Sequence, residues 1–153
     1  MDLRTKQYIN ELESLKGVID KVDDDEVKSF LARFFCIRTS GLMEVFLKER
    51  ISEYSRGKVP SVINRFLTSK FKDITNLKSS RLVDVLKSFS PDWADSFENY
   101  LEEHEQQKNS LDSVIAQRHS IAHGQPASVS VVSMTQYFED VKNVVNYLDT
   151  VIR

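Results

Sequence analysis

The fold is decided by the long apolar stretch from Val27 to Phe46, which reads VKSFLARFFCIRTSGLMEVF. Its apolar residues recur every three or four positions, as they do on one face of an α-helix. The acidic run Asp23–Glu26 overlaps its start, where negative charge favours the free N–H groups of a helix. Gly57 follows, and glycine commonly ends helices, so we predict one long helix over roughly residues 24–56. Its apolar face is expected to comprise Val27, Phe30, Leu31, Phe34, Ile37, Gly41, Leu42, Val45 and Phe46.

Helical spacing continues on both sides of this stretch. On the N-terminal side it predicts a helix over roughly residues 4–22. On the C-terminal side, further helices are expected from Pro60, over residues 79–89, from Pro91 behind an N-capping Ser90, over the segment that Gly124 ends, and from a Ser133–Gln136 capping box onward. The strand-like stretch Val129–Val132 is too short and isolated to form a sheet. We predict an all-α helical bundle of six to seven helices with no significant sheet, in a single domain of residues 1–153.

The composition is that of an ordinary globular domain. The chain has 153 residues, of which 41% are hydrophobic and 29% charged, and its formal net charge is −2. Its single cysteine, Cys36, excludes an internal disulfide and is expected to be a small buried side chain. No apolar run reaches membrane-spanning length and the start is not signal-like, which indicates a cytoplasmic protein without membrane contact.

Charge is unevenly distributed along the chain. Residues 48–87 hold ten basic and four acidic residues, a local charge of +6. The remainder holds 11 basic and 19 acidic residues, a charge of −8, and residues 90–107 hold six acids and no base. A positive segment can follow a phosphate backbone, although a solvated helix face has the same composition.

The chemically distinctive segment runs from Arg118 to Gly124 and reads RHSIAHG. One interpretation pairs Arg118 with His123 on a phosphodiester. A guanidinium group donates several hydrogen bonds to phosphate oxygens, and an imidazole accepts or donates a proton near neutral pH. In RNA the 2′-hydroxyl can itself attack the phosphorus, so this chemistry needs neither a metal nor a cofactor.

A second interpretation of the same segment is a metal site. His119 and His123 are four residues apart, which places them about 40° apart on an ideal helix and suits two metal ligands. A third ligand would have to come from His104, Glu105 or Asp112. Arg118 and His123, by contrast, point about 140° apart on a continuous helix. They converge if the helix loosens near Gly124, or if two copies of the segment meet in a dimer.

Two segments resemble motifs of the HEPN superfamily (higher eukaryotes and prokaryotes nucleotide-binding domains). The segment Arg118–Gly124 is similar to the Arg-(Asn/His)-x-(Ile/Val)-(Ala/Val)-His form of stand-alone bacterial HEPN proteins, including the RiboL-PSP-HEPN type. The stretch Glu44–Lys48 is similar to their Glu-(Gly/Ala)-aromatic-aliphatic-Lys stretch, except that Val45 replaces the small residue. The closing helix from Ser133 to Ile152 also has the place and length expected of such a protein.

This resemblance implies an endoribonuclease that cleaves RNA without a metal and leaves 2′,3′-cyclic phosphate and 5′-hydroxyl ends. Arg118 and His123 match the catalytic pair, and His119 matches a supporting position beside the arginine. Glu44 and Lys48 match the second motif as supporting or substrate-binding residues, or else form an ordinary i,i+4 ion pair. The resemblance further implies a homodimer with a composite active site, in a toxin–antitoxin or anti-phage defence setting with an antitoxin or effector partner. The alternative is a non-catalytic HEPN module that binds RNA, a nucleotide or a partner protein.

Overall fold

The computed structural model describes all of residues 1–153. It contains seven α-helices, one short 3₁₀-helix and no strand, which confirms the predicted all-α bundle. No helix combines the length and the apolar character needed to cross a membrane. The elements in chain order are α1 (Leu3–Ile19), α2 (Asp25–Ser55), α3 (Ser61–Lys70), η1 (Phe71–Asp73), α4 (Ser79–Phe89), α5 (Pro91–Glu103), α6 (Glu105–Ala122) and α7 (Val131–Val151).

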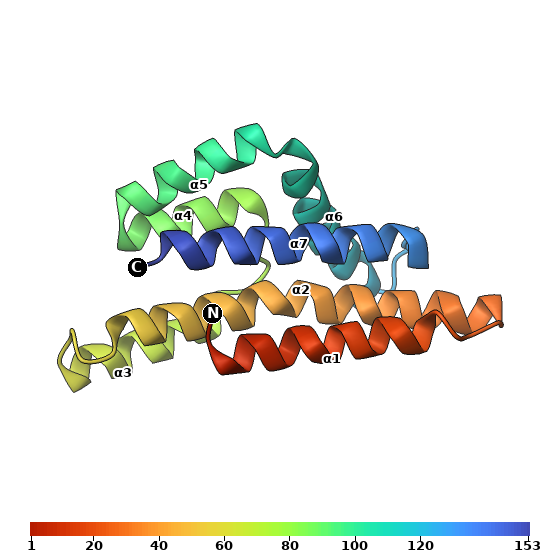
Figure 1. The fold of residues 1–153 in the computed structure, drawn as a ribbon, viewed down its shortest axis with the longest axis horizontal. Coiled ribbons are helices and arrows are strands. Elements are labelled where there is room, and N and C mark those ends of the chain that lie inside the picture. Colours follow the sequence, from red (N-terminus) through yellow and green to blue (C-terminus); the bar gives the residue numbers. More distant parts are fainter.

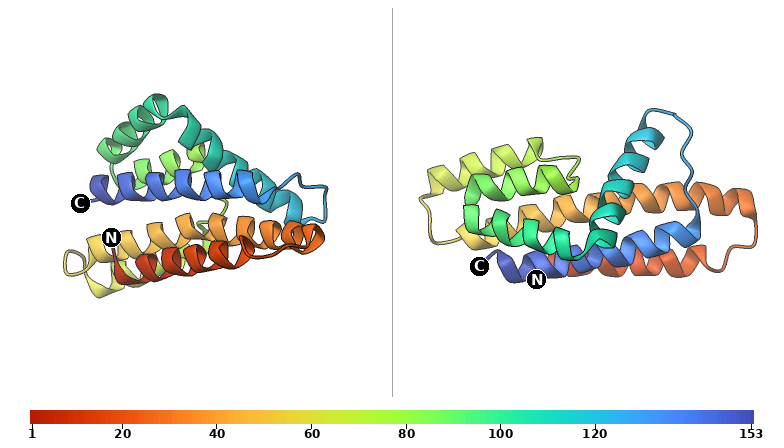
Figure 2. Two further views of the ribbon diagram at one scale, coloured as in Figure 1. Left: turned by 45° about the vertical axis from the view of Figure 1, so that its right-hand side comes forward. Right: turned by 90° about the horizontal axis from the view of Figure 1, so that it is seen from above.

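The 31-residue helix α2 forms the long axis of the molecule. Helix α1 runs antiparallel along one side of it and α7 runs along another, while α3 lies beside its C-terminal end (Figure 1). Helices α4 and α5 form a hairpin on the side of α7. Helix α6 leaves this hairpin and crosses obliquely to the N-terminal half of α2, as the two views in Figure 2 show. The C-terminal end of α6 therefore lies at the far end of the bundle from the chain termini.

One connected cluster of 28 buried residues holds these helices together. Its largest side chains include Phe35 and Phe46 of α2, Phe97 of α5 and Phe138 of α7. The rings of Phe35 and Phe138 meet edge to face with their centroids 5.3 Å apart. Because full burial of one phenylalanine contributes about 1.5–3 kcal/mol, the contact between α2 and α7 is a principal source of stability.

The ends of α2 agree with the prediction, and the acidic run acts as expected. Asp24 is the N-cap, and its carboxylate accepts a hydrogen bond from the Val27 N–H at 2.9 Å. Asp25 and Glu26 occupy the first turn, where they face the positive end of the helix dipole. Helix α1 ends at Ile19, three residues earlier than expected, because the chain must turn before the α2 cap.

The start of the last helix corrects the prediction. The capping box joins Ser130 and Ser133 instead of Ser133 and Gln136. The Ser130 hydroxyl accepts from the Ser133 N–H at 3.1 Å, and the Ser133 hydroxyl accepts from the Ser130 N–H at 3.2 Å. Serine side chains satisfy both free donors, so α7 starts one turn early and takes in the last residues of the strand-like stretch.

The predicted apolar face of α2 is only partly buried, which is a second correction. Phe30, Phe34 and Ile37 are 59%, 46% and 39% exposed, and Val27 is exposed as well. Phe35 and Cys36, one position away, are buried in their place. The physical reason is that α2 carries apolar residues around most of its circumference, while α1, α6 and α7 cover only part of it. We refer to Val27, Phe30, Phe34 and Ile37 as the α2 apolar face.

A buried carboxylate joins α6 to α7 and generates a stability prediction. Asp140 is 3% exposed and accepts a hydrogen bond from the Ser110 hydroxyl at 2.6 Å, as well as bonds from two glutamine amides. Replacing Asp140 by Ala leaves the buried Ser110 hydroxyl without this partner, so we expect a loss of about 1–3 kcal/mol in unfolding free energy. Urea denaturation measures it, with the exposed Asn143→Ala on the same helix as the control. Equal losses in the two variants would contradict this account.

Candidate active site at the end of α6

The C-terminal end of α6 is closed by a Schellman motif around Gly124, as the sequence predicts. His123 is the C-cap, and Gly124 adopts φ +64. The Gln125 N–H donates to the Ser120 carbonyl at 2.9 Å, and the Gly124 N–H donates to the Ile121 carbonyl at 3.2 Å. These two bonds satisfy carbonyls that the helix end would leave free, so α6 stays regular up to its last turn.

The two histidines lie side by side on the exposed side of this helix end. The ring centroids of His119 and His123 are 4.4 Å apart, and both side chains are exposed. No group of three or more His, Cys, Asp or Glu side chains is arranged to hold a metal ion, so no third ligand accompanies this pair. Two neighbouring imidazoles beside solvent can still accept and donate protons.

Arg118 is held by the loop between η1 and α4. Its side chain is half-buried, and its Nη1 atom donates a hydrogen bond to the Asn76 Oδ1 atom. The backbone N–H of Asn76 in turn donates to the Glu44 Oε1 atom at 3.1 Å. The structure therefore connects the arginine of one predicted motif to the glutamate of the other through a third residue.

Sequence reasoning missed Asn76. It lies in the connection between η1 and α4 and has φ +54, the only positive φ of a non-glycine residue in the chain. Asparagine tolerates this left-handed conformation better than most residues, so an asparagine between two helices signals a turn. Nothing in the local sequence indicates that the turn lies against Arg118, because the two residues are 42 positions apart.

Glu44 and Lys48 do not form the ordinary ion pair that their spacing allows. The Glu44 carboxylate accepts from Asn76, while Lys48 is exposed. Both side chains line a shallow depression that also includes Arg4 and Lys72. The lining holds three basic side chains and also a second acid, Glu49, which pairs with Arg4 at 3.0 Å, so Lys48 and Lys72 are the cations left to meet an anionic ligand.

Arg118 and His123 do not come together within one chain. Arg118 contacts the Asn76 loop, whereas His123 pairs with His119 at the exposed end of the helix. Because α6 remains regular to Ala122, their directions differ by about 140°. Of the two ways to bring them together, the loosened helix end is not the conformation seen in this structure, where the Schellman motif closes it.

The α2 apolar face leads directly to this site. Phe30, Ile37 and Glu44 are successive positions seven residues apart, so they share one side of α2 to within about 20° per step. Glu44 contacts the Asn76 loop, which holds Arg118. An uncovered apolar surface and the candidate catalytic arginine are therefore neighbours.

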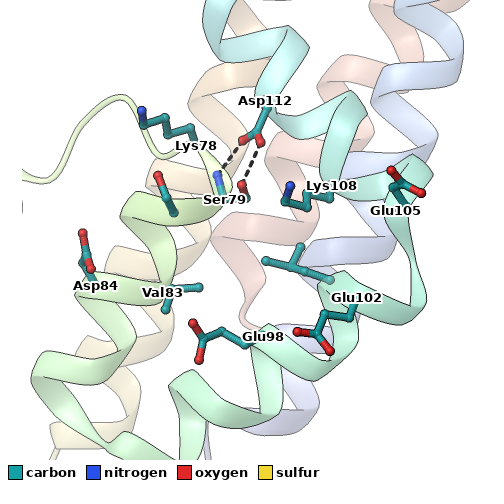
Figure 3. Close-up of a pocket in the computed structure, with 11 residues that line it drawn as sticks. Lys78, Ser79, Val83, Asp84, Glu98, Glu102, Glu105, Lys108 and Asp112 are labelled. Atoms are coloured by element: carbon teal, nitrogen blue, oxygen red, sulfur yellow. Dashed lines mark hydrogen bonds between the residues drawn. The ribbon is translucent and has the colours of Figure 1, made fainter.

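A separate depression between α4, α5 and α6 has the opposite charge (Figure 3). Its lining includes five acidic side chains, Asp84, Glu98, Glu102, Glu105 and Asp112, and two lysines, Lys78 and Lys108. Asp112 accepts bonds at 2.7 Å from both the backbone N–H and the hydroxyl of Ser79, so it caps α4 from α6. An acidic lining repels phosphate, and we do not place the candidate site there.

Cys36 of α2 contacts α6 at Val114, one turn before Arg118. Its thiol is fully buried and donates a hydrogen bond to the Val114 carbonyl, with 3.6 Å between sulfur and oxygen. Burial raises the pKa of this thiol from 9.0 to about 12, and the positive charge of Arg118 offsets the rise only in part. The thiol is therefore a packing group, as its sequence context predicts.

Comparison with known proteins gives one match. The sequence model of the RiboL-PSP-HEPN family matches residues 3–153, which is nearly the whole chain. No curated protein and no solved structure matches significantly.

The raised pKa of the Cys36 thiol predicts a pH dependence of stability. Between about pH 9 and 12, the unfolded thiol loses a proton that the folded thiol keeps, so stability falls as the pH rises. This single group contributes up to about 1.4 kcal/mol per pH unit. We expect unfolding free energies measured by urea denaturation at pH 8–11 to fall less steeply for Cys36→Ala than for the wild type. Equal pH dependences of the unfolding free energy in the two proteins would show that folding does not raise the pKa of the Cys36 thiol.

Proposed function

The chain belongs to the RiboL-PSP-HEPN family, whose HEPN domains are nuclease-like or RNA-related modules, and we propose from this premise that it is a metal-independent endoribonuclease. Arg118 and His123 are the proposed catalytic residues, and His119 is the proposed supporting residue. The observation that carries the proposal is an arginine held at the surface by a neutral amide, at the same end of α6 as two exposed histidines.

The proposed reaction is an internal transesterification of RNA. One imidazole takes the proton of a ribose 2′-hydroxyl, and the 2′-oxygen attacks the adjacent phosphorus. The bond from phosphorus to the 5′-oxygen breaks, and that oxygen takes a proton from an imidazolium. The products are a 2′,3′-cyclic phosphate and a 5′-hydroxyl. Arg118 stabilises the negative charge that builds on the phosphoryl oxygens.

This chemistry needs the arginine and a histidine on one phosphate, and a homodimer supplies that arrangement. Within one chain the two side chains point in different directions from a regular helix. The α2 apolar face lies on the same helix as Glu44, and burying its exposed side chains on a second copy is favourable. A two-fold axis close to this face would place two arginines and four histidines around one cleft.

A second candidate function is a non-catalytic module that binds RNA or a partner protein such as an antitoxin. A surface on α3 favours it. Val62, Ile63 and Phe66 are exposed, and α3 has no buried residue. Residues 56–72 carry five basic side chains and no acidic one. An apolar and basic helix face suits an acidic amphipathic segment or a single-stranded nucleic acid.

The remaining features belong to the same proposal. We take residues 1–153 as a single HEPN domain that acts in the cytoplasm, without a cofactor, in a toxin–antitoxin or anti-phage defence setting. Lys48 and the basic residues near it are the proposed contacts to the RNA backbone, because they line the depression next to Glu44.

Cleavage of a generic single-stranded RNA in EDTA tests the proposed chemistry. Arg118→Ala and His123→Ala should each lower the rate by about 100-fold or more, because each removes a group that acts in the transition state. His104→Ala and Arg153→Ala serve as controls of the same residue types outside the site. The wild type should leave 2′,3′-cyclic phosphate ends and leave DNA intact. Wild-type rates in both site variants would refute the assignment.

A charge on the α2 apolar face tests the proposed dimer. Phe34→Asp places two negative charges in a two-fold interface. We therefore expect the dissociation constant of the dimer to rise by about 100-fold or more. Because Phe34 is exposed in the single chain, monomer stability should change little. Sedimentation equilibrium and cleavage assays over a dilution series measure both effects, with Leu3→Asp as the exposed control. A monomeric wild type with full activity would exclude the composite site.

A further inference from the structure

Asn76 is the point at which three parts of the chain meet. Its side-chain oxygen accepts from Arg118 on α6, and its backbone N–H donates to Glu44 on α2 at 3.1 Å. Its carbonyl accepts from the Lys78 N–H at 2.9 Å, just before α4 begins. One exposed loop residue thus links the two helices that carry the two sequence motifs.

The loop around Asn76 is held in place independently of Arg118. Leu77 is fully buried, and the backbone N–H and hydroxyl of Ser79 both donate to Asp112 at 2.7 Å. The left-handed backbone of Asn76 costs most residues about 1–2 kcal/mol, but asparagine tolerates it, so the loop adopts this turn without help from Arg118. The loop therefore presents the amide to the arginine, and the arginine adjusts to it.

The chemistry of this contact matters because the acceptor is neutral. A guanidinium has five N–H donors, and the Asn76 oxygen accepts from Nη1 without cancelling the positive charge. The carboxylate of Glu44 is nearby, but it is bonded to the Asn76 backbone. A direct ion pair with Glu44 would hold the arginine equally well and would neutralise the charge that a phosphate needs.

We propose that Asn76 is a positioning residue that aims Arg118 at the scissile phosphate while leaving its charge available. The role rests on the proposed ribonuclease function, since it concerns the geometry of that arginine. It adds to the two sequence motifs a third residue, from a loop that neither motif contains. Asn76 itself does not act on the RNA.

Two substitutions separate the side chain of Asn76 from its backbone. Asn76→Gly removes the amide but keeps the N–H that bonds Glu44, and glycine adopts positive φ at no steric cost. Asn76→Asp keeps the size and the acceptor but places a negative charge on the guanidinium. The exposed Asn146→Asp on α7 is the control for the added charge alone.

Activity and stability should move independently in these variants. We expect kcat/KM for RNA cleavage to fall by about 10- to 100-fold in both Asn76 variants. Arg118 would be misplaced in Asn76→Gly and its charge would be neutralised in Asn76→Asp, and either change weakens its contact with the transition state by about this factor. Asn76→Gly should unfold at the same urea concentration as the wild type or a higher one. Binding of an uncleavable 2′-deoxy-substituted RNA should lose about one unit of salt slope in Asn76→Asp only. A merely structural residue would lower stability and activity together.

The outcomes distinguish this proposal from the proposed function. If the wild type cleaves RNA and both Asn76 variants match it, the positioning role is overturned and the ribonuclease function stands. If the wild type does not cleave, the proposed function fails, and NMR signals of the Arg118 guanidinium decide the positioning role. Slow rotation of the guanidinium in the wild type and fast rotation in Asn76→Gly would support it. Identical signals in the two proteins would overturn it.

Discussion

The crossing of α6 over α2 is the contact on which the candidate site depends. The buried Cys36 thiol meets the Val114 carbonyl at this crossing. Arg118 lies one turn further along α6 than Val114, and from there its side chain reaches the Asn76 loop. The last turn of α6 extends past the crossing into solvent, which is why the histidines are exposed while the arginine is half-buried.

This crossing also explains why the bundle leaves an apolar surface uncovered. Helix α2 is long enough to contact α1, α6 and α7, but α6 leaves its N-terminal half at an oblique angle. The α2 apolar face lies in the sector that none of these helices covers. Phe30, Phe34 and Ile37 therefore stay partly in water, and burying them against another surface would be favourable by several kcal/mol, about 1.5–3 kcal/mol for each fully buried side chain.

The two depressions beside the Asn76 loop differ in charge. The depression between α4, α5 and α6, which includes Asp112, is acidic, whereas the depression that includes Glu44 and Lys48 has three basic and two acidic side chains. The segment from Asn76 to Ser79 runs between them: the Asn76 N–H donates to Glu44, and the Ser79 N–H donates to Asp112. A net charge of −2 thus conceals an uneven surface, with five acidic side chains gathered in one depression.

The sequence by itself determined the helices, their order and the family, since helical periodicity, caps and two short motifs are local patterns. The acidic cap of α2 and the Gly124 motif at the end of α6 illustrate this, because their partners are within a few residues. Only the tertiary structure decided which apolar residues of α2 are buried, that Glu44 bonds the Asn76 loop instead of Lys48, and that Asn76 meets Arg118 from 42 positions away. These outcomes depend on how helices cross, and a crossing is set by the packing of side chains that are distant in sequence, which no local pattern records.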